Sequence, residues 1–454
     1  MMKVTLVYPF FKPFNDNSIF RFPPLGLGYI AASLRKHGVD VELVDCTFLT
    51  REEALAKAKR SKPQIIGFYS MFSMKKTTLE LAALLRKDCE LLVVGGPLPT
   101  LEPAGYLNVF DVAVLGEGEP AMTEIVECYR KGVDFSGLQG IAYKEEGMVK
   151  CTSPRKHVED LDSLPFPSRD LFDNEAYKRH YLRRFGYSIS PLITSRGCPF
   201  SCDFCSRPVF GQSFRARSAS NVVDEVEEIV GLGYDRVWFA DDCFTLNRER
   251  LMDVCGELVK RKVDVSWECL SRVDTMDREV ATAMRRSGCV RVFFGIESGT
   301  DEVLSLMQKQ ITVEQAHRAV YNAKETGLRV GAFFILGYPG ESDETVLDTV
   351  RFASGLPLDY LSFTLPYPIP GTALFERVKG NGGLVVEDWE EPKNYALIRH
   401  KLLCNAGFSE AKLKFAIGKA HVQFYGKRFL GKRGYSVVGS PFERATDAAF
   451  KLMK

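Results

Sequence analysis

The sequence predicts an α/β protein: a doubly wound parallel sheet, then a partial (βα)6 barrel, then a small, mostly helical C-terminal segment. Two observations favour this fold. Short β-rich runs alternate with helical stretches through residues 1–135, and a second alternating series begins at Tyr187. Such alternation is typical of βαβ units and parallel sheets. The predicted parts are residues 1–135, a hairpin and linker over 136–186, the barrel over 187–379 and a basic segment over 380–454.

In the first part, five β-rich runs are separated by helical stretches. The predicted strands are Lys3–Tyr8, Val41–Asp45, Gln64–Tyr69, Glu90–Val94 and Asp111–Leu115, and the predicted helices are Gly26–His37, Glu52–Arg60, Thr77–Lys87 and Glu119–Lys131. Doubly wound sheets bind ligands beyond the carboxyl ends of their strands. The loops after the first, fourth and fifth strands are therefore candidate ligand loops.

In the second part, six strands alternate with five helices. The predicted strands are Ser188–Thr194, Arg236–Ala240, Asp264–Leu270, Val290–Gly295, Arg329–Leu336 and Tyr360–Leu365. The predicted helices are Ala219–Gly231, Arg248–Lys262, Asp277–Ser287, Val313–Thr326 and Asp343–Ser354. Because six βα units are too few for a closed eightfold barrel, we expect an open one.

Composition and charge exclude several classes of protein. The 454 residues are 45% hydrophobic and 26% charged, as in ordinary globular proteins, and the net charge of +2 gives no field that argues for nucleic acid. No apolar run approaches the length of a membrane span, and the N-terminus lacks the features of a signal peptide. We therefore expect a cytoplasmic protein, with peripheral membrane contact left open.

Of the twelve cysteines, nine are scattered singly and three are clustered. Without a signal peptide, reduced thiols are a better interpretation of the nine than disulfides. The cluster ITSRGCPFSCDFCSRP holds Cys198, Cys202 and Cys205 in C-x3-C-x2-C spacing directly after a predicted strand. A cubane iron–sulfur cluster usually takes four thiolates, so three would leave one iron open to an exogenous ligand. A structural zinc site is the alternative, but it would need a fourth ligand, and no second cysteine pair lies nearby.

The cysteine motif, with aromatic Phe204 before its last cysteine, resembles the signature of the radical S-adenosylmethionine (SAM) superfamily. The resemblance extends from about Tyr187 to Phe375. It implies that the three cysteines hold a [4Fe–4S] cluster whose open iron binds the amino and carboxylate groups of SAM. It also implies reductive cleavage of SAM to a 5′-deoxyadenosyl radical, with flavodoxin or ferredoxin as the electron donor.

By the same resemblance, residues at the ends of the barrel strands contact SAM. It implies that Phe204 and the loop of Gly337 and Glu341 lie at the adenine and that Glu297 and Ser298 contact the ribose. It also implies that Asp241 and Asp242 meet the methionyl amino group and that Arg272 pairs with the methionyl carboxylate. These cofactor-binding candidates are Phe204, Asp241, Asp242, Arg272, Glu297, Ser298, Gly337 and Glu341. Simpler interpretations remain open for four of the positions. Phe204 could be a core residue, the aspartate pair could cap the following helix, and Arg272 could form a surface salt bridge.

The first part resembles the cobalamin-binding domain found in many radical SAM enzymes. The segments PPLGLG, IIGFYS, VVGGPLPT and LGEGE carry this resemblance together. It implies cofactor-binding roles for Pro24, Leu25, Gly26, Tyr69, Ser70, Gly95, Gly96, Pro97, Leu98, Glu117, Gly118 and Glu119. The loop after the first strand contains no histidine, and Leu98 stands where many members have one, so cobalamin would bind without a histidine below cobalt. A flavodoxin-like regulatory domain is the alternative.

A radical initiator joined to a cobalamin domain implies methylation of an unactivated carbon. One SAM molecule would supply the methyl group and a second the radical, and the substrate would be a small or lipid-like molecule rather than nucleic acid. Ring closure or rearrangement remains an alternative. A methylthiotransferase is disfavoured because Cys46, Cys89 and Cys128 are dispersed, and a non-catalytic scaffold is disfavoured because an open-iron cluster has no structural purpose.

The last segment is strongly basic. Residues 401–454 contain 11 Lys and Arg against three Asp and Glu. Within Ser409–Tyr425, apolar residues recur at helical spacing, and Lys412, Lys414 and Lys419 are predicted to lie on the opposite face. This face would suit an anionic or membrane-associated substrate, or it could simply be solvated.

Overall fold

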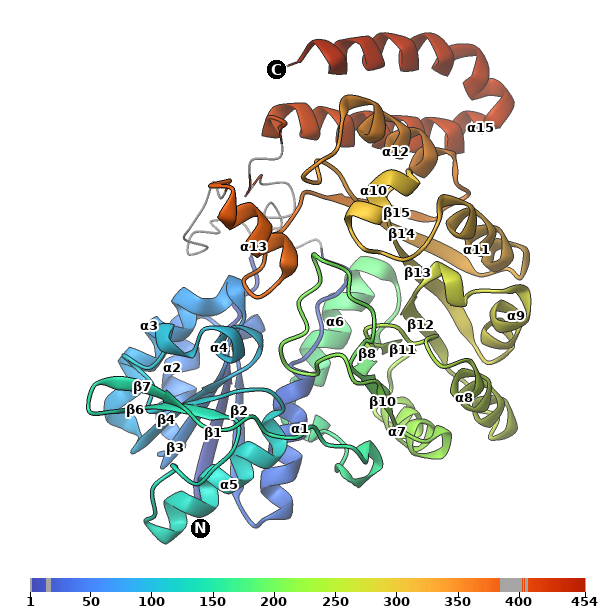
Figure 1. Cartoon of the computed structure of the whole chain (residues 1–454). Helices are drawn as coiled ribbons and strands as arrows, with labels where there is room; N and C mark the ends of the chain where they lie inside the picture. The colour runs from blue at the N-terminus through green and yellow to red at the C-terminus, as the bar shows by residue number, and fades with distance from the viewer. Residues whose placement is uncertain (1, 14–17, 384–401, 403, 405–406, 454) are drawn as a thin grey trace. The chain divides into compact units, whose positions relative to one another are not determined.

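The computed structural model describes residues 2–13, 18–383, 402, 404 and 407–453 (Figure 1). The chain divides into two compact units. The first contains the described parts of Met1–Cys198 with Arg207–Val237, and the second contains Pro199–Ser206 with the described parts of Trp238–Asp388 and Leu397–Lys454.

The first unit is built on a seven-stranded sheet of order β2-β1-β3-β4-β5-β6-β7. Five strands are parallel: β1 (Lys3–Tyr8), β2 (Asp40–Asp45), β3 (Ile65–Tyr69), β4 (Leu91–Gly95) and β5 (Val112–Val114). Strand β6 (Ile141–Glu145) pairs antiparallel with β5, and β7 (Met148–Cys151) pairs antiparallel with β6 to form a hairpin at the sheet edge. The chain leaves β1 toward β2 on one side and later continues with β3 on the other. The crevice between β1 and β3 is therefore the topological switch point, where such sheets bind ligands.

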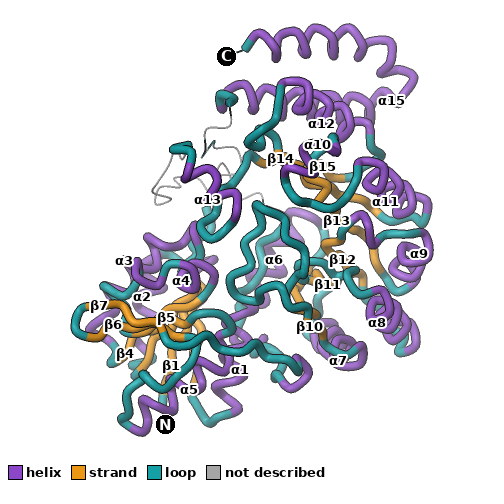
Figure 2. The backbone as a smooth tube through the Cα atoms, in the orientation of Figure 1, coloured by secondary structure: helices purple, strands orange, loops and turns teal. Residues whose placement is uncertain are grey.

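Helices cover both faces of this sheet, as Figure 2 shows. Apolar side chains of α1 (Leu25–Lys36) and α5 (Gly118–Lys131) form a core on one face. Those of α2 (Arg51–Arg60), α3 (Lys75–Leu85) and α4 (Pro97–Leu101) form a core on the other. Both cores consist largely of alternating strand residues and apolar helix stripes.

The rest of the first unit leads to the cysteine loop. It contains α6 (Asn174–Phe185), β8 (Ile189–Leu192), the short pair β9 (Ser195–Arg196) and β10 (Arg215–Ala216), and α7 (Ala219–Gly231). Helix α6 lies within the residues expected to be a linker; Asp173 caps it and Gly186 ends it in the left-handed conformation. This helix was not among the predicted helices; Ala176, Tyr177 and Tyr181 give it a buried face.

A second, six-stranded sheet has the order β15-β14-β13-β12-β11-β8. Its later strands are β11 (Arg236–Phe239), β12 (Ser266–Ser271), β13 (Cys289–Glu297), β14 (Arg329–Ile335) and β15 (Tyr360–Thr364). Strands β12 to β15 pair in parallel. The order ends in two different edge strands, so the sheet is open, and the α/β fold with a partial barrel is confirmed.

Helices follow the strands of the second sheet in turn. They are α8 (Arg248–Lys260), α9 (Arg278–Arg286), α10 (Asp301–Leu306), α11 (Val313–Glu325), α12 (Asp343–Gly355) and α13 (Ala373–Gly380). Polar side chains cap most of them. Thr312 and Gln315 form a capping box at α11, and Ser342 caps α12. These caps account for the close agreement between predicted and observed helix starts.

The C-terminal helix α15 (Glu410–Leu452) packs its apolar stripe inward, but one prediction about it is wrong. Lys412 and Lys419 do not lie on an open basic face: they are 7% and 4% exposed, and each pairs with an aspartate. Lys414 alone of the three is exposed. The apolar stripe was predicted correctly. The side of the first half of α15 that carries Lys412 and Lys419 is, however, covered by helix α12 and by the second half of α15.

Among the described residues, no helix has the length and apolar character needed to cross a membrane.

Candidate functional site

Gly197 shapes the entry to the cysteine loop. Its φ is +83°, and a Cβ there would lie 2.2 Å from the carbonyl oxygen of Ser213. Only glycine fits such a position. The next residue, Cys198, donates its N–H to the carbonyl oxygen of Gly211 at 3.3 Å. Arg207 also donates to the Cys198 carbonyl oxygen, so backbone packing and one side chain together fix the chain direction at the first cysteine.

The centre of the cysteine loop is fixed within the second unit by Asp203. Its N–H donates to the carbonyl oxygen of Met307 at 3.1 Å, and its carbonyl oxygen accepts from Leu374 N–H at 3.0 Å. Its carboxylate accepts a hydrogen bond from the Tyr338 hydroxyl and lies 3.0 Å from Arg377. Asp203 is 3% exposed, so these polar contacts replace water around a buried carboxylate.

No disulfide joins any of the twelve cysteines in this structure. Cys198 and Cys202 are half-buried and Cys205 is exposed. Cys198 falls in the first unit, and the other two fall in the second. No three His, Cys, Asp or Glu side chains in the described part of the chain surround a single metal position. Ligation by the three cysteines therefore stays a prediction.

Lys309 was not among the residues predicted from the sequence. As a buried cation, it would stabilise a negatively charged group near Cys202. It is 8% exposed, donates to Oε1 of Glu297 at 2.9 Å and lies 5.8 Å from the centre of the Phe204 ring. Burial would lower its pKa, but attraction to Glu297 and then Cys202 outweighs burial and raises the pKa above its usual value. A buried cation near the cysteine loop would balance the negative charge of a thiolate-ligated cluster. The donor set thus fits an iron–sulfur cluster.

Glu297 and Ser298 end β13, where the sequence placed a ribose-contacting pair. Glu297 has φ of +72°, unusual for a residue with a side chain, and its carboxylate holds Lys309. The Ser298 hydroxyl is buried, 3.1 Å from that of Thr349 and 3.4 Å from that of Thr300. A strained backbone held by surrounding contacts is common at functional sites. Contact of this pair with SAM remains a prediction.

Arg272 has a more enclosed environment than either sequence interpretation assumed. Its guanidinium makes two 2.9 Å bonds to Asp274, one of 3.1 Å to the carbonyl oxygen of Lys309, and stacks 3.5 Å from the Phe200 ring centre. It is 5% exposed. The salt bridge left open by the sequence is present, but only its Asp274 side is open to solvent, because Arg272 itself is buried. A role for Arg272 with the SAM carboxylate stays untested.

Asp241 and Asp242 follow β11 and differ in exposure. Asp241 is 1% exposed, whereas Asp242 is exposed. The alternative that this pair caps the next helix is wrong, because Asn247 caps α8 by accepting from Arg250 N–H at 3.0 Å.

The loop after β14 carries Gly337 and Glu341. Gly337 has φ of +79°, and a Cβ there would meet Leu413 at 2.3 Å. One carboxylate oxygen of Glu341 accepts from Tyr338 N–H at 2.7 Å, whereas Oε1 is buried without a hydrogen-bond partner among the described residues. Burial raises the pKa of Glu341 to about 8. An orphaned acceptor in a loop predicted to meet adenine fits a ligand contact.

At the switch point of the first unit, aromatic side chains end β1 and β3. The rings of Tyr8 and Tyr69 lie 5.6 Å apart, and burial raises the pKa of Tyr69 to about 12. Gly96 has φ of +111°, and a Cβ there would lie 2.6 Å from the carbonyl oxygen of Ser70. Aromatic surface beside tight backbone turns fits a large flat ring such as a corrin.

Other residues predicted for cobalamin have partners within the first unit. The Ser70 hydroxyl bonds to Tyr106 at 2.7 Å, and Leu98 is a core residue with 1% exposure on helix α4 rather than on a loop. Pro24, Leu25 and Gly26 form the start of α1, and Gly95 and Pro97 flank Gly96. None of these observations tests cobalamin binding, which stays a prediction for each residue.

Glu117 and Glu119, on either side of Gly118, are bound by arginine. Arg196 bonds to Glu117 at 2.7 Å and to Glu119 at 2.6 Å, and Arg215 also bonds to Glu117 at 2.9 Å. Burial would raise the pKa of Glu117, but these arginines hold it below its ordinary value. Because Arg196 stands two residues before Cys198, the LGEGE loop supports the strand that leads to the cysteine loop.

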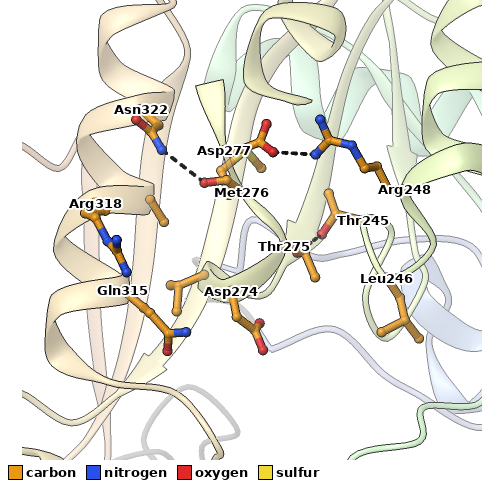
Figure 3. Close-up of a pocket in the computed structure, with 12 residues that line it drawn as sticks. Thr245, Leu246, Arg248, Asp274, Thr275, Met276, Asp277, Gln315, Arg318 and Asn322 are labelled. Carbon is orange, nitrogen blue, oxygen red and sulfur yellow. Dashed lines mark hydrogen bonds and ion pairs between the residues drawn. The ribbon is translucent and has the colours of Figure 1, made fainter. Parts of the chain in front are cut away.

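A cavity of about 420 Å³ lies apart from these residues, between the segment after β12 and helix α11 (Figure 3). The Arg248–Asp277 ion pair and the bond of 3.3 Å from Asn322 to the carbonyl oxygen of Met276 stand at its wall. No residue predicted to bind a cofactor lines it, so it is not the predicted site.

Comparisons with known proteins match both parts of the chain. A family model described as the radical SAM superfamily matches residues 192–353, and one described as a B12 binding domain matches residues 13–126. An uncharacterized methyltransferase of Pyrococcus horikoshii is 34% identical over 439 residues, covering 94% of this chain and 93% of the relative. An anaerobic magnesium-protoporphyrin IX monomethyl ester cyclase of Rubrivivax gelatinosus is 29% identical over 400 residues, covering 83% and 70%.

The fold is also similar to that of a solved structure. The cobalamin-dependent SAM radical enzyme OxsB, with aqua-cobalamin and SAM bound, has a TM-score of 0.78 and 20% identity, covering all of this chain and 72% of that one. At this identity the likeness shows a shared fold.

Proposed function

Since this chain belongs to the radical SAM superfamily, in the branch that carries a B12-binding domain, we propose that it methylates an unactivated carbon of a small-molecule or lipid-like substrate. The observation that carries the proposal is the union of the two domains in one chain, together with a relative named as a methyltransferase that matches both over 94% of this chain. A radical SAM domain alone would leave the reaction type open.

The cofactors proposed are a [4Fe–4S] cluster, SAM and cobalamin. When bound, they supply the 5′-deoxyadenosyl radical and the methyl group, and the protein positions them. Cys198, Cys202 and Cys205 would hold the cluster. Lys309, paired with Glu297 at 2.9 Å, would balance negative charge beside Cys202.

Other residues would orient SAM and exclude water. Phe204 packs with the buried cluster of Ile335 and Tyr338, next to the loop that holds Glu341. With a pKa raised to about 8, Glu341 carries its proton at neutral pH. A protonated carboxyl can donate as well as accept, which suits the edge of an adenine base. An external flavodoxin or ferredoxin would deliver the electron, and the cytoplasmic location expected from the sequence is consistent with such a donor.

The ratio of co-products tests the reaction. In a methylation of this type, one SAM molecule gives S-adenosylhomocysteine and another gives 5′-deoxyadenosine, so turnover should yield both in roughly equal amounts. The anaerobically reconstituted enzyme would be incubated with metabolite extract from a deletion strain, and both products quantified by mass spectrometry.

A cyclase is the second candidate, favoured by the 29% identity to a magnesium-protoporphyrin ester cyclase over 83% of this chain. It would form 5′-deoxyadenosine without matching S-adenosylhomocysteine. That outcome would replace the methylation proposal.

A further inference from the structure

Helix α15 folds back on itself as a hairpin of two helical segments. The backbone turns at Gly431, where φ is 68° and ψ is 165°. Lys412 Nζ in the first segment lies 4.8 Å from the Phe450 ring centre in the second, and Lys419 pairs with Asp447. The residue number increases from 412 to 419 along the first segment, while that of the facing residue decreases from 450 to 447. The two segments are therefore antiparallel, as the red helix in Figure 1 shows.

Tyr435 closes the hairpin near its turn. A Cβ on Gly426 would lie 2.9 Å from the Tyr435 ring, and one on Gly439 would lie 2.3 Å from it. The two glycines thus give the ring room to pack between the segments. Residues 427–434 form the tip beyond this contact.

The tip combines exposed apolar side chains with positive charge. Its sequence is KRFLGKRG, with four basic residues and no acidic one. Phe429 is 90% exposed and Leu430 is 46% exposed. A phenylalanine so open to water is unfavourable unless something covers it.

The apolar surface continues from the tip along one side of the first segment. Val422 and Tyr425 are 54% and 61% exposed and precede Phe429 by seven and four residues, so the three share one helix face. The neighbouring Gln423 and Phe424 point into the protein and are buried. In all, α15 carries six of the 13 large apolar side chains that are exposed in the described part of the chain.

Charge complementarity identifies the occupant of this surface. Aromatic and aliphatic residues flanked by Lys and Arg are typical of segments that lie in a bilayer interface, where the apolar groups enter the acyl boundary and the cations meet anionic headgroups. We propose that the hairpin tip, together with the adjoining Val422 and Tyr425, docks onto an anionic membrane surface. Docking does not depend on the proposed reaction, although it would bring the enzyme to a lipid-like substrate.

Vesicle sedimentation tests the proposal with the full chain. The protein should co-sediment with vesicles of equal parts phosphatidylcholine and phosphatidylglycerol, more weakly with pure phosphatidylcholine, and less at high salt. Replacing Phe429→Ser and Leu430→Ser together should lower the binding constant at least about tenfold, because two apolar side chains no longer enter the bilayer. Both side chains are exposed, so the thermal unfolding midpoint should not change.

Val259→Ser is the matched control. Val259 is 46% exposed, like Leu430, and is followed by Lys260 and Arg261, both paired with Glu257, just as Lys427 of the tip is paired with Glu443. This variant should bind vesicles like the wild type. Equal binding by the Phe429/Leu430 variant would overturn the proposal. So would a tip-dependent dimer, or tip-dependent binding of tRNA, without vesicle binding. Vesicle binding is measured without turnover, so its failure would leave the methylation proposal standing.

Discussion

Tyr338 donates its phenolic O–H to the carboxylate of Asp203, and both side chains are buried. Asp203 stands between Cys202 and Phe204 in the cysteine loop, and Tyr338 belongs to the loop after β14. The bond therefore joins the segment that would carry the iron–sulfur cluster to the segment predicted to contact adenine. Binding of the cluster and binding of SAM are expected to be coupled through this contact.

The variant Tyr338→Phe tests that coupling. It leaves Asp203 without its hydroxyl donor, which costs about 1–3 kcal/mol when the acceptor is buried. We expect the dissociation constant for SAM to rise about tenfold while iron content stays unchanged, as measured by equilibrium dialysis and iron analysis. Tyr425→Phe, at an exposed position, is the control. Unchanged SAM affinity in Tyr338→Phe would show that the bond serves the fold alone.

Replacing any of the three clustered cysteines should affect cluster binding and SAM cleavage, whereas replacing the other nine should not. Alanine in place of Cys198, Cys202 or Cys205 should abolish both the broad visible absorption of the reconstituted cluster and the cleavage of SAM. Cys151→Ala is a suitable control because Cys151 is exposed and remote in sequence from the motif. Full SAM cleavage by the triple variant would contradict the assignment.

Glu341 should make stability depend on pH. Its pKa is raised by burial from 4.5 to about 8, so the folded protein keeps a proton that the unfolded chain has already released. Between these pH values, rising pH stabilises the unfolded chain, and the free energy of unfolding falls by about 1.4 kcal/mol per pH unit from this group.

Glu341→Gln removes this contribution and keeps the acceptor for Tyr338 N–H. In urea unfolding from pH 5 to 8, the difference in stability between variant and wild type should therefore grow with pH, in favour of the variant. Parallel curves for the two proteins would show that Glu341 ionises normally.

The predicted mode of cobalamin binding can be checked by spectroscopy. The loop after β1 contains no histidine, and Leu98 occupies the position after the GGP turn. We therefore expect the electron paramagnetic resonance spectrum of the cob(II)alamin form to lack nitrogen superhyperfine splitting. Clear nitrogen coupling would indicate an axial base, and failure to take up any corrinoid would favour the flavodoxin-like alternative.

The fold could be predicted from sequence because local signals agree with tertiary structure. Predicted strands and helices match within a few residues where caps such as Thr50 and Asn247 mark the starts. Candidate residues could be located through their motifs, but their partners could not. Lys309 stands in the polar stretch MQKQI, and nothing local shows that a turn of this composition is buried beside Glu297.

The prediction of an open basic face on α15 was wrong for the same reason: tertiary partners could not be located from the sequence. Helical periodicity shows which side of a helix is apolar, but it cannot show that another element covers the polar side. Lys412 and Lys419 look solvated in sequence because Asp343 and Asp447, their partners, lie far away along the chain.

Lys412 should consequently contribute to stability rather than to binding. Its Nζ lies 2.8 Å from Asp343, and its side chain is 9% exposed, whereas that of Asp343 is 26% exposed. Lys412→Ala leaves a partly buried carboxylate without its cation, which should lower the free energy of unfolding by about 1–3 kcal/mol. Lys414→Ala removes an exposed pair with Glu410 and should change it by less than about 0.5 kcal/mol. Urea unfolding of both variants measures the difference, and equal effects would mean that Lys412 is as solvated as Lys414.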